Sequence, residues 1–247
     1  MRKTIFVTGG ATGIGAAAVR CFYEKGCNVA YLDIKEGDTP LGALFIKGDV
    51  RNPKEVSLAY KKTYDKFGAI DAIVANAGKH YSDSIFDLDY QEVLNTINLN
   101  VMGAVVTIHE ALPYLNSEAA SIVIVASDQS LIGKKHSLSY GLTKGALGQM
   151  TKSLALDMGP KNIRVNAVCP ATIDTPLTRN ALLKYVEREG IKDYSMASLL
   201  QDESCGIALG RIGRAEEVAE LINFLASDKA SFITGGLFPI DGGLTAG

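Results

Sequence analysis

Residues 8–15 read Thr-Gly-Gly-Ala-Thr-Gly-Ile-Gly and are the most informative part of the sequence about its fold. It follows a run of β-branched and aromatic residues, Thr4 to Thr8, and opens a segment of helical period from Gly13 to Lys25. Glycines between a strand and a helix allow a tight turn, while the free N–H groups at the helix start favour a pyrophosphate. The stretch predicts a dinucleotide-binding α/β fold, although many strand-to-helix loops are glycine-rich without binding any ligand.

The next apolar run supports the cofactor hypothesis because it ends at an acidic residue, Asp33. Asp33 lies 18 residues after Gly15, near the offset at which a carboxylate accepts hydrogen bonds from an adenosine ribose. That carboxylate would repel a 2′-phosphate, and neither Thr12 nor Ile34 is a basic residue. The sequence therefore predicts NAD as the cofactor, with NADP the less favoured alternative that Lys35 keeps open.

Short β-branched runs alternate with longer segments of helical period along the chain, which is typical of βαβ units. The predicted strands are Thr4 to Thr8, Asn28 to Asp33, Ala43 to Gly48, Ala69 to Ala75, Ala120 to Ser127, Ile163 to Cys169 and Leu237 to Ile240. The predicted helices are Gly13 to Lys25, Pro53 to Phe67, Tyr90 to Leu115, Ser139 to Met158 and Glu216 to Ala226. We predict a three-layer, doubly wound Rossmann fold of class α/β, with a seven-stranded, mostly parallel sheet and helices on both faces.

Two segments depart from this alternation. Residues 34–48 contain Gly37, Pro40 and Gly42 and are too short for a crossover helix, so a loop or at most one helical turn is expected there. Residues 175–213 are long and mixed in polarity, and we expect them to form a lid. No repeat or linker composition divides the chain, so residues 1–247 are expected to form a single Rossmann-type domain.

Composition excludes several classes of function. The 247 residues are 47% apolar, enough for one core, and 25 basic against 27 acidic residues give a net charge of −2. The chain lacks the basic field of a nucleic-acid-binding protein. Its four cysteines include no C-x-x-C pair, so neither a disulfide framework nor a metal site is predicted. The apolar run after Lys3 is too short to cross a membrane, and we expect a soluble, cytoplasmic protein without a membrane partner.

The spacing Gly9-x-x-x-Gly13-x-Gly15 resembles that of the short-chain dehydrogenase/reductase family, and the resemblance covers nearly the whole chain. Further motifs of that family appear in order: Asp49-Val50, Asn76-Ala77-Gly78, Asn100-Val101-Met102-Gly103, Ser127, Tyr140-Gly141-Leu142-Thr143-Lys144 and Asn166-Ala167-Val168-Cys169-Pro170. The resemblance implies an oxidoreductase that assembles as a homotetramer through the helices starting at Tyr90 and Ser139. This chain differs from the family at Ala171, where the family usually has glycine; the methyl group is a small change that fits unless the backbone there needs a positive φ.

Tyr140 and Lys144 are four residues apart, so both side chains project from one helix face. Ser127 precedes Tyr140 by 13 residues at the carboxyl end of a strand, where α/β sheets bind ligands. Hydride transfer from an alcohol requires a base, and a tyrosine with a pKa near 10 needs a neighbouring cation to serve as one. We predict Tyr140 as the acid/base, Lys144 as that cation and Ser127 as the group that orients the substrate oxygen.

The resemblance adds the remaining site residues. It implies that Lys144 also binds the nicotinamide ribose and that Asn100 positions a water that relays protons to Lys144; a helix-packing amide is the alternative for Asn100. The predicted catalytic set is Asn100, Ser127, Tyr140 and Lys144. The predicted cofactor-binding residues are Gly9, Thr12, Gly13, Ile14, Gly15, Asp33, Ile34, Asp49, Val50, Asn76, Ala77, Gly78, Tyr140, Lys144, Pro170, Ile173 and Thr175.

The substrate is less defined by the sequence. Polar residues after the serine, Asp128 and Gln129, suit a hydroxylated small molecule, and the predicted substrate contacts are Ser127, Gln129, Tyr140 and Tyr185. The three histidines lack ligand spacing and are expected to be structural or solvent-facing, although His136 is close enough to Tyr140 to reach the substrate mouth.

The main hypothesis is an NAD-dependent dehydrogenase of a secondary alcohol, such as a sugar or polyol. The alternatives are an NADPH-dependent 3-oxoacyl-carrier-protein reductase or other carbonyl reductase, and, in another class, a non-catalytic dinucleotide-binding regulator. A regulator needs none of the proton chemistry that Ser127, Tyr140 and Lys144 provide, whereas an NADPH reductase would favour a basic residue at Thr12 or Ile34.

Overall fold

The computed structural model describes residues 2–247 and contains one central sheet of seven parallel strands. The strand order is β3-β2-β1-β4-β5-β6-β9. The strands are β1 (Thr4–Thr8), β2 (Asn28–Asp33), β3 (Leu44–Lys47), β4 (Ala72–Ala75), β5 (Ala120–Val125), β6 (Ile163–Pro170) and β9 (Leu237–Ile240). From β1 the chain adds β2 and β3 on one side of the sheet and then returns to add β4, β5, β6 and β9 on the other. An open α/β sheet binds its ligands at such a switch point, here between β1 and β4.

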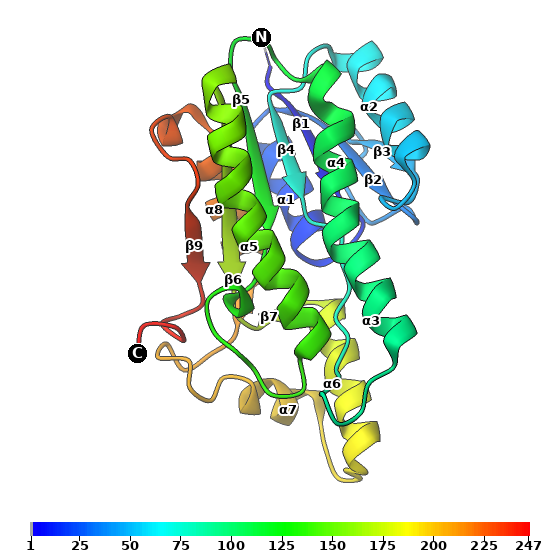
Figure 1. The fold of residues 1–247 in the computed structure, drawn as a ribbon, viewed down its shortest axis with the longest axis vertical. Helices are drawn as coiled ribbons and strands as arrows, with labels where there is room; N and C mark the ends of the chain where they lie inside the picture. Colours follow the sequence, from blue (N-terminus) through cyan, green and yellow to red (C-terminus); the bar gives the residue numbers. More distant parts are fainter. Residues whose placement is uncertain (1) are drawn as a thin grey trace.

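Helices cover both faces of the sheet (Figure 1). One face carries α2 (Pro53–Phe67), α4 (Gly103–Ala111) and α5 (Leu138–Met158), while α1 (Gly13–Glu24) and α8 (Ala215–Ala226) pack together on the other. The predicted three-layer, doubly wound fold is confirmed, and so is the position of each of the seven predicted strands to within a few residues.

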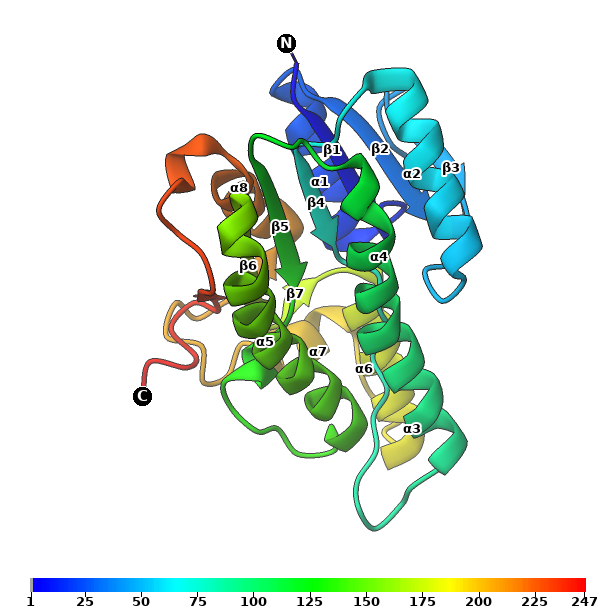
Figure 2. The ribbon, with the colours of Figure 1, turned by 45° about the horizontal axis from the view of Figure 1, so that its top comes forward.

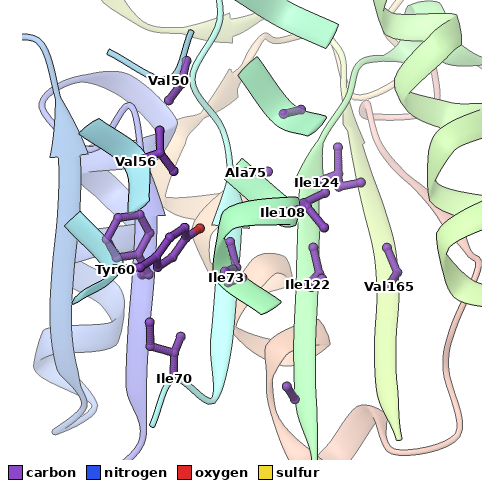
Figure 3. Close-up of a cluster of buried hydrophobic side chains, with 14 of the residues drawn as sticks. Val50, Val56, Tyr60, Ile70, Ile73, Ala75, Ile108, Ile122, Ile124 and Val165 are labelled. Atoms are coloured by element: carbon purple, nitrogen blue, oxygen red, sulfur yellow. The ribbon is translucent and has the colours of Figure 1, made fainter. Parts of the chain in front are cut away.

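The core consists of two apolar layers, one on each side of the sheet. Figure 3 shows part of the layer beneath α2 and α4, where Ile73 and Ile122 from adjacent strands point toward Tyr60 and Ile108. Tyr60 is wholly buried, and its hydroxyl donates to the carbonyl oxygen of Thr107 at 2.8 Å. This bond satisfies the one polar atom of an otherwise apolar side chain and ties α2 to α4.

The segment predicted as one helix from Tyr90 to Leu115 is interrupted, so that prediction is wrong in detail. α3 (Tyr90–Ile97) is followed by a π-helical segment, η1 (Asn98–Met102), then by α4 and a 3₁₀ turn, η2 (Leu112–Tyr114). A π segment inserts one extra residue in the turn, and such insertions often occur at functional sites. Here it contains Asn100, a residue of the predicted catalytic set.

Of the two segments predicted to depart from the strand–helix alternation, one is irregular as expected and the other contains helices. Residues 34–43 form no helix, as predicted, and lead directly into β3. Residues 175–213 contain two helices that the sequence analysis did not predict, α6 (Pro176–Glu189) and α7 (Met196–Asp202), and a short parallel pair, β7 (Ile173–Asp174) with β8 (Gly213–Arg214), closes the segment. Figures 1 and 2 place α6 and α7 beyond the carboxyl ends of the sheet strands.

Within residues 2–247, no helix combines the length and the apolar character that a membrane-spanning segment requires.

Candidate active site

A cleft of about 390 Å³ runs along the carboxyl ends of the strands at the switch point. It brings together residues from eight separate stretches of sequence. Of the predicted cofactor residues, all except Gly15 line it, namely Gly9, Thr12, Gly13, Ile14, Asp33, Ile34, Asp49, Val50, Asn76, Ala77, Gly78, Tyr140, Lys144, Pro170, Ile173 and Thr175.

The glycine turn has a backbone that only glycine adopts easily. Gly9 and Gly13 have φ values of +67° and +56°, in the left-handed region. Asn76 fastens the turn to β4, because its side-chain amide donates to the carbonyl oxygens of Thr8 and Gly9 at 3.0 Å each. Gly15 lies beneath the turn, where a Cβ atom would collide with the carbonyl oxygen of Gly9.

Replacing Gly15 by alanine should therefore displace the turn. We expect a loss of about 1–3 kcal/mol in the free energy of unfolding and weaker binding of NADH, measured by thermal denaturation and fluorescence titration. Gly145→Ala is the matched control, since this helical glycine in α5 has open space around it and the same change should gain up to about 1 kcal/mol. An unchanged NADH affinity in Gly15→Ala would contradict the assigned role of the turn.

The first turn of α1 provides a suitable place for a pyrophosphate. Thr12 is its N-cap residue, but no side-chain hydrogen bond caps the helix and no acidic residue lies in the first turn. The N–H groups at this end are thus available to an anion. Together with the glycine turn, they fit the phosphates of a dinucleotide.

Asp33 and Asp49 play different structural parts at the edge of this cleft. Asp33 Oδ2 accepts from the N–H of Ala11 at 3.0 Å, which holds the carboxylate beside the glycine turn. Asp49 forms an ion pair with Arg51, whose Nε donates to both carboxylate oxygens of Asp49 at 3.0 Å. This pairing lowers the pKa of Asp49. Arg51 also lines the cleft, and the sequence analysis did not identify it.

A second cavity of about 290 Å³ adjoins the cleft, and both are lined by Ser127 and Tyr140. All four predicted substrate contacts line it, with Gln129 following the serine and Tyr185 coming from α6. His136 also lines it, as its spacing from Tyr140 suggested. The structure thus contains a long cleft and a side cavity that meet at the tyrosine and the serine.

Tyr140 and Lys144 lie one turn apart on α5, with Lys144 Nζ 5.5 Å from the centroid of the tyrosine ring. The Lys144 ammonium donates to the carbonyl oxygen of Val125 at 2.8 Å, and its burial lowers the pKa of Lys144 to about 8. Burial raises the pKa of Tyr140, while a hydrogen bond with Ser127 lowers it and the charge of Asp128 raises it further. Tyr140 therefore needs added positive charge before it ionises near neutral pH.

Asn100 lies behind this group and does not line either cavity. Its amide bonds to both backbone groups of Lys79, accepting from the N–H and donating to the carbonyl oxygen at 2.9 Å each. The amide also donates to the Thr143 hydroxyl at 3.1 Å, and that hydroxyl donates to the carbonyl oxygen of Tyr140 at 2.7 Å. Asn100 thus connects the loop after β4 to the helical turn that carries Tyr140.

His80 is a site residue that the sequence analysis missed. Its ring packs against the ring of Tyr140, with centroids 4.8 Å apart at 59°, and it lines the second cavity. Burial lowers the pKa of His80 to about 4, so the imidazole is neutral at pH 7. The available signal was its position two residues after Gly78, because that loop leaves β4 at the same sheet edge as Ser127.

Comparison with known proteins agrees with this geometry. Residues 9–245 match the family model described as Enoyl-(Acyl carrier protein) reductase. L-fucose dehydrogenase of Mus musculus is 35% identical, over 99% of this chain and 89% of that protein. A short-chain dehydrogenase family protein from Francisella tularensis has 40% identity and a TM-score of 0.91, with 100% of both chains covered. Aldohexose dehydrogenase of Thermoplasma acidophilum has 35% identity and a TM-score of 0.92, covering 100% of this chain and 95% of that one.

The fold and its switch-point cleft define a dinucleotide-binding oxidoreductase. The chain belongs to the short-chain dehydrogenase/reductase family, whose dehydrogenases use nicotinamide cofactors.

Proposed function

We propose that this enzyme is an NAD-dependent dehydrogenase that oxidises a secondary alcohol of a sugar or polyol. The observation that carries the proposal is the position of Tyr140 and Ser127 at the junction of the two cavities, with the Lys144 ammonium buried behind them. A binding protein without catalysis does not need this arrangement, in which a buried ammonium adjoins a half-buried phenol that lines both cavities.

In this proposal, Tyr140 removes the proton from the substrate hydroxyl and Ser127 holds the substrate oxygen in reach of Tyr140. Lys144 stabilises the phenolate through its charge and binds the nicotinamide ribose. When bound, the oxidised nicotinamide supplies the hydride acceptor and a further positive charge. Asn100 acts as a positioning residue through its bonds to Lys79 and Thr143, and we infer that a relay water lies beside it.

The second cavity supports a hydroxylated substrate. It is lined by several hydrogen-bonding groups, among them His80, Gln129 and Ser137. The Ser137 hydroxyl is buried and has no hydrogen-bond partner among residues 2–247. A buried hydroxyl without a partner costs about 1–3 kcal/mol, which a substrate hydroxyl would offset. Two of the similar proteins are named as dehydrogenases of sugars, L-fucose and aldohexose.

The segment of residues 175–213 is proposed to serve as the lid of this cavity. Leu182 and Val186 of α6 pack with Leu199 of α7 in an apolar cluster separate from the two core layers. Such a small satellite cluster allows the two helices to move together as a unit relative to the sheet.

A homotetramer formed through the helices starting at Tyr90, now divided into α3, η1 and α4, and at Ser139, which is α5, also remains a proposal. Both helices carry exposed apolar side chains, including Val105 on α4 with Leu142 and Leu156 on α5. A cytoplasmic location is likewise an inference from the sequence.

Cofactor choice and substrate class can be tested together. We expect NADH to bind at least about tenfold more tightly than NADPH, because the Asp33 carboxylate beside the glycine turn repels a 2′-phosphate. Asp33→Ser should reduce that preference. Sugars, polyols and hydroxyacyl thioesters are then screened with each cofactor. Tighter binding of NADPH, or turnover of thioesters alone, would favour an NADPH-dependent reductase, for which Lys35 and Arg51 supply cations at the cleft edge.

A further inference from the structure

Asp128 is a buried carboxylate in direct contact with the proposed substrate-orienting serine. It follows Ser127 at the end of β5, and only 1% of its surface is exposed. The Ser127 hydroxyl donates to Asp128 Oδ1 at 2.7 Å. A carboxylate in this place is costly to bury, and the proposed mechanism has not used it.

Lys134 provides the charge that compensates this carboxylate. Its Nζ lies 2.6 Å from Asp128 Oδ2, an ion contact without the angles of a directed hydrogen bond, and no other side chain within residues 2–247 pairs with that oxygen. The lysine comes from the loop between η3 (Asp128–Ser130) and α5, and 32% of its side chain is exposed. The pair therefore links the reaction centre to the rim of the second cavity.

The bond to Asp128 decides what Ser127 offers to its other neighbours. A hydroxyl has one proton, and here the carboxylate takes it as the stronger acceptor. The serine oxygen accepts from the N–H of Gln129 at 3.2 Å and has one more lone pair available for a donor. With its proton on Asp128, the Ser127 oxygen offers this lone pair to a single donor, and Ser127 donates to the Tyr140 phenolate or to a substrate oxygen only by turning away from Asp128.

The same carboxylate places a negative charge beside a phenol that must ionise. The groups around Tyr140 are Lys144 on its own helix, His80 from the loop after β4, and Ser127 with Asp128 from the end of β5. His80 is neutral, so Asp128 opposes phenolate formation while Lys144 favours it. The ammonium of Lys134 offsets the charge of Asp128.

We propose that Asp128 and Lys134 form a positioning pair for Tyr140 and Ser127. The carboxylate sets the direction of the Ser127 hydroxyl, and the lysine cancels the carboxylate charge so that Tyr140 can ionise. The inference rests on the proposed function, since it assumes that Tyr140 is the base.

The test uses Asp128→Asn, which keeps an oxygen acceptor for Ser127 but removes the charge, and Lys134→Met, which leaves the charge uncompensated. Lys134→Arg keeps the cation, and Lys135→Met is the matched control because this adjacent lysine forms no ion pair among the described residues. Two quantities are measured in each variant: the pH at half-maximal kcat, and the ionisation of Tyr140 by ultraviolet difference titration against the same protein carrying Tyr140→Phe.

We expect Asp128→Asn to move both midpoints down by about one pH unit and Lys134→Met to move both up by a similar amount. Lys134→Arg and Lys135→Met should leave both midpoints in place. The double variant Asp128→Asn/Lys134→Met should show a smaller upward shift than Lys134→Met alone, because the charge that Lys134 offsets is gone.

Midpoints that stay fixed in Asp128→Asn and Lys134→Met, with only a fall in thermal stability, would overturn the pairing and leave a structural role. The ultraviolet titration is made with NAD⁺ bound, because the charge of the nicotinamide lowers the pH at which Tyr140 ionises, and it requires no substrate, so it remains decisive if no alcohol is turned over. A failure of the proposed function would give a different result, because turnover would then survive Tyr140→Phe.

Discussion

Substitution of Tyr140 by phenylalanine should lower kcat for any alcohol substrate by about 10²–10⁴-fold, the range that general acid–base catalysis contributes. The change removes only the phenolic oxygen and retains the ring that packs against His80. We therefore expect the melting temperature and the dissociation constant for NADH to stay close to those of the wild type.

Tyr185→Phe is the matched control for this experiment. Tyr185 also lines the substrate cavity, but its hydroxyl is on α6 and its side chain is partly exposed, with no contact to the lysine that stabilises a phenolate. Its loss should raise KM by a few fold and leave the pH dependence of kcat unchanged. Comparable losses of kcat in the two variants would contradict the assignment of Tyr140 as the base.

The parts of this molecule that were predictable are those in which local sequence determines local structure. The conformation of the turn could be predicted from its glycines, because Gly9 and Gly13 have positive φ and Gly15 has no room for a side chain. The apolar run of β5 is wholly buried, as expected for a strand covered on both faces. The i, i+4 spacing likewise put Tyr140 and Lys144 on one face of α5.

The interruption of the helix at Asn100 was not predictable, because its cause is distant in sequence. The apolar pattern of residues 90–111 is continuous. The π segment is linked to the rest of the molecule by the bonds of Asn100 to Lys79 and Thr143, two residues that are distant in sequence. The helix α6 was missed for another reason. Its cap residue, Thr175, and the proline after it form a recognisable helix start, but the polar composition that follows gave a weak apolar pattern.

The second cavity shows the same limit of local reasoning. Its walls come from the loops after β4 and β5 and from α6, elements far apart in the sequence. His80 enters the site because β4 lies beside β5 in the sheet, and strand order, rather than any motif, places it against Tyr140. The sequence predicted the residues at which the two cavities meet more completely than the residues that form the rest of the second cavity.

Lys144→Met should abolish activity and, at pH 7, raise the stability of the cofactor-free protein. The activity is lost because the phenolate of Tyr140 loses its fixed cation. The gain in stability has a different origin: Lys144 is only 6% exposed, and burial lowers its pKa from 10.5 to about 8. The folded protein therefore holds this proton less tightly than the unfolded chain does, which disfavours folding by the full amount at every pH below about 8.

The size of this penalty is about 3 kcal/mol, of which the loss of the hydrogen bond to Val125 would offset roughly 1 kcal/mol. We expect a net gain of about 1–2 kcal/mol, or a few degrees in melting temperature. The sign can be checked by repeating the measurement at higher pH. Between the pKa of about 8 in the folded state and 10.5 in the unfolded state, the penalty in the wild type fades, so the advantage of Lys144→Met should shrink as pH rises from 7 to 9.5.

Lys152→Met, a change at another lysine of the same helix but on its exposed surface, serves as the control and should show no pH-dependent gain. A variant Lys144→Met that is less stable than the wild type at pH 7 would mean that the ammonium stabilises the fold through its bond to Val125. A variant that is more stable but inactive would show that the enzyme retains a destabilising buried charge because the ionisation of Tyr140 depends on it.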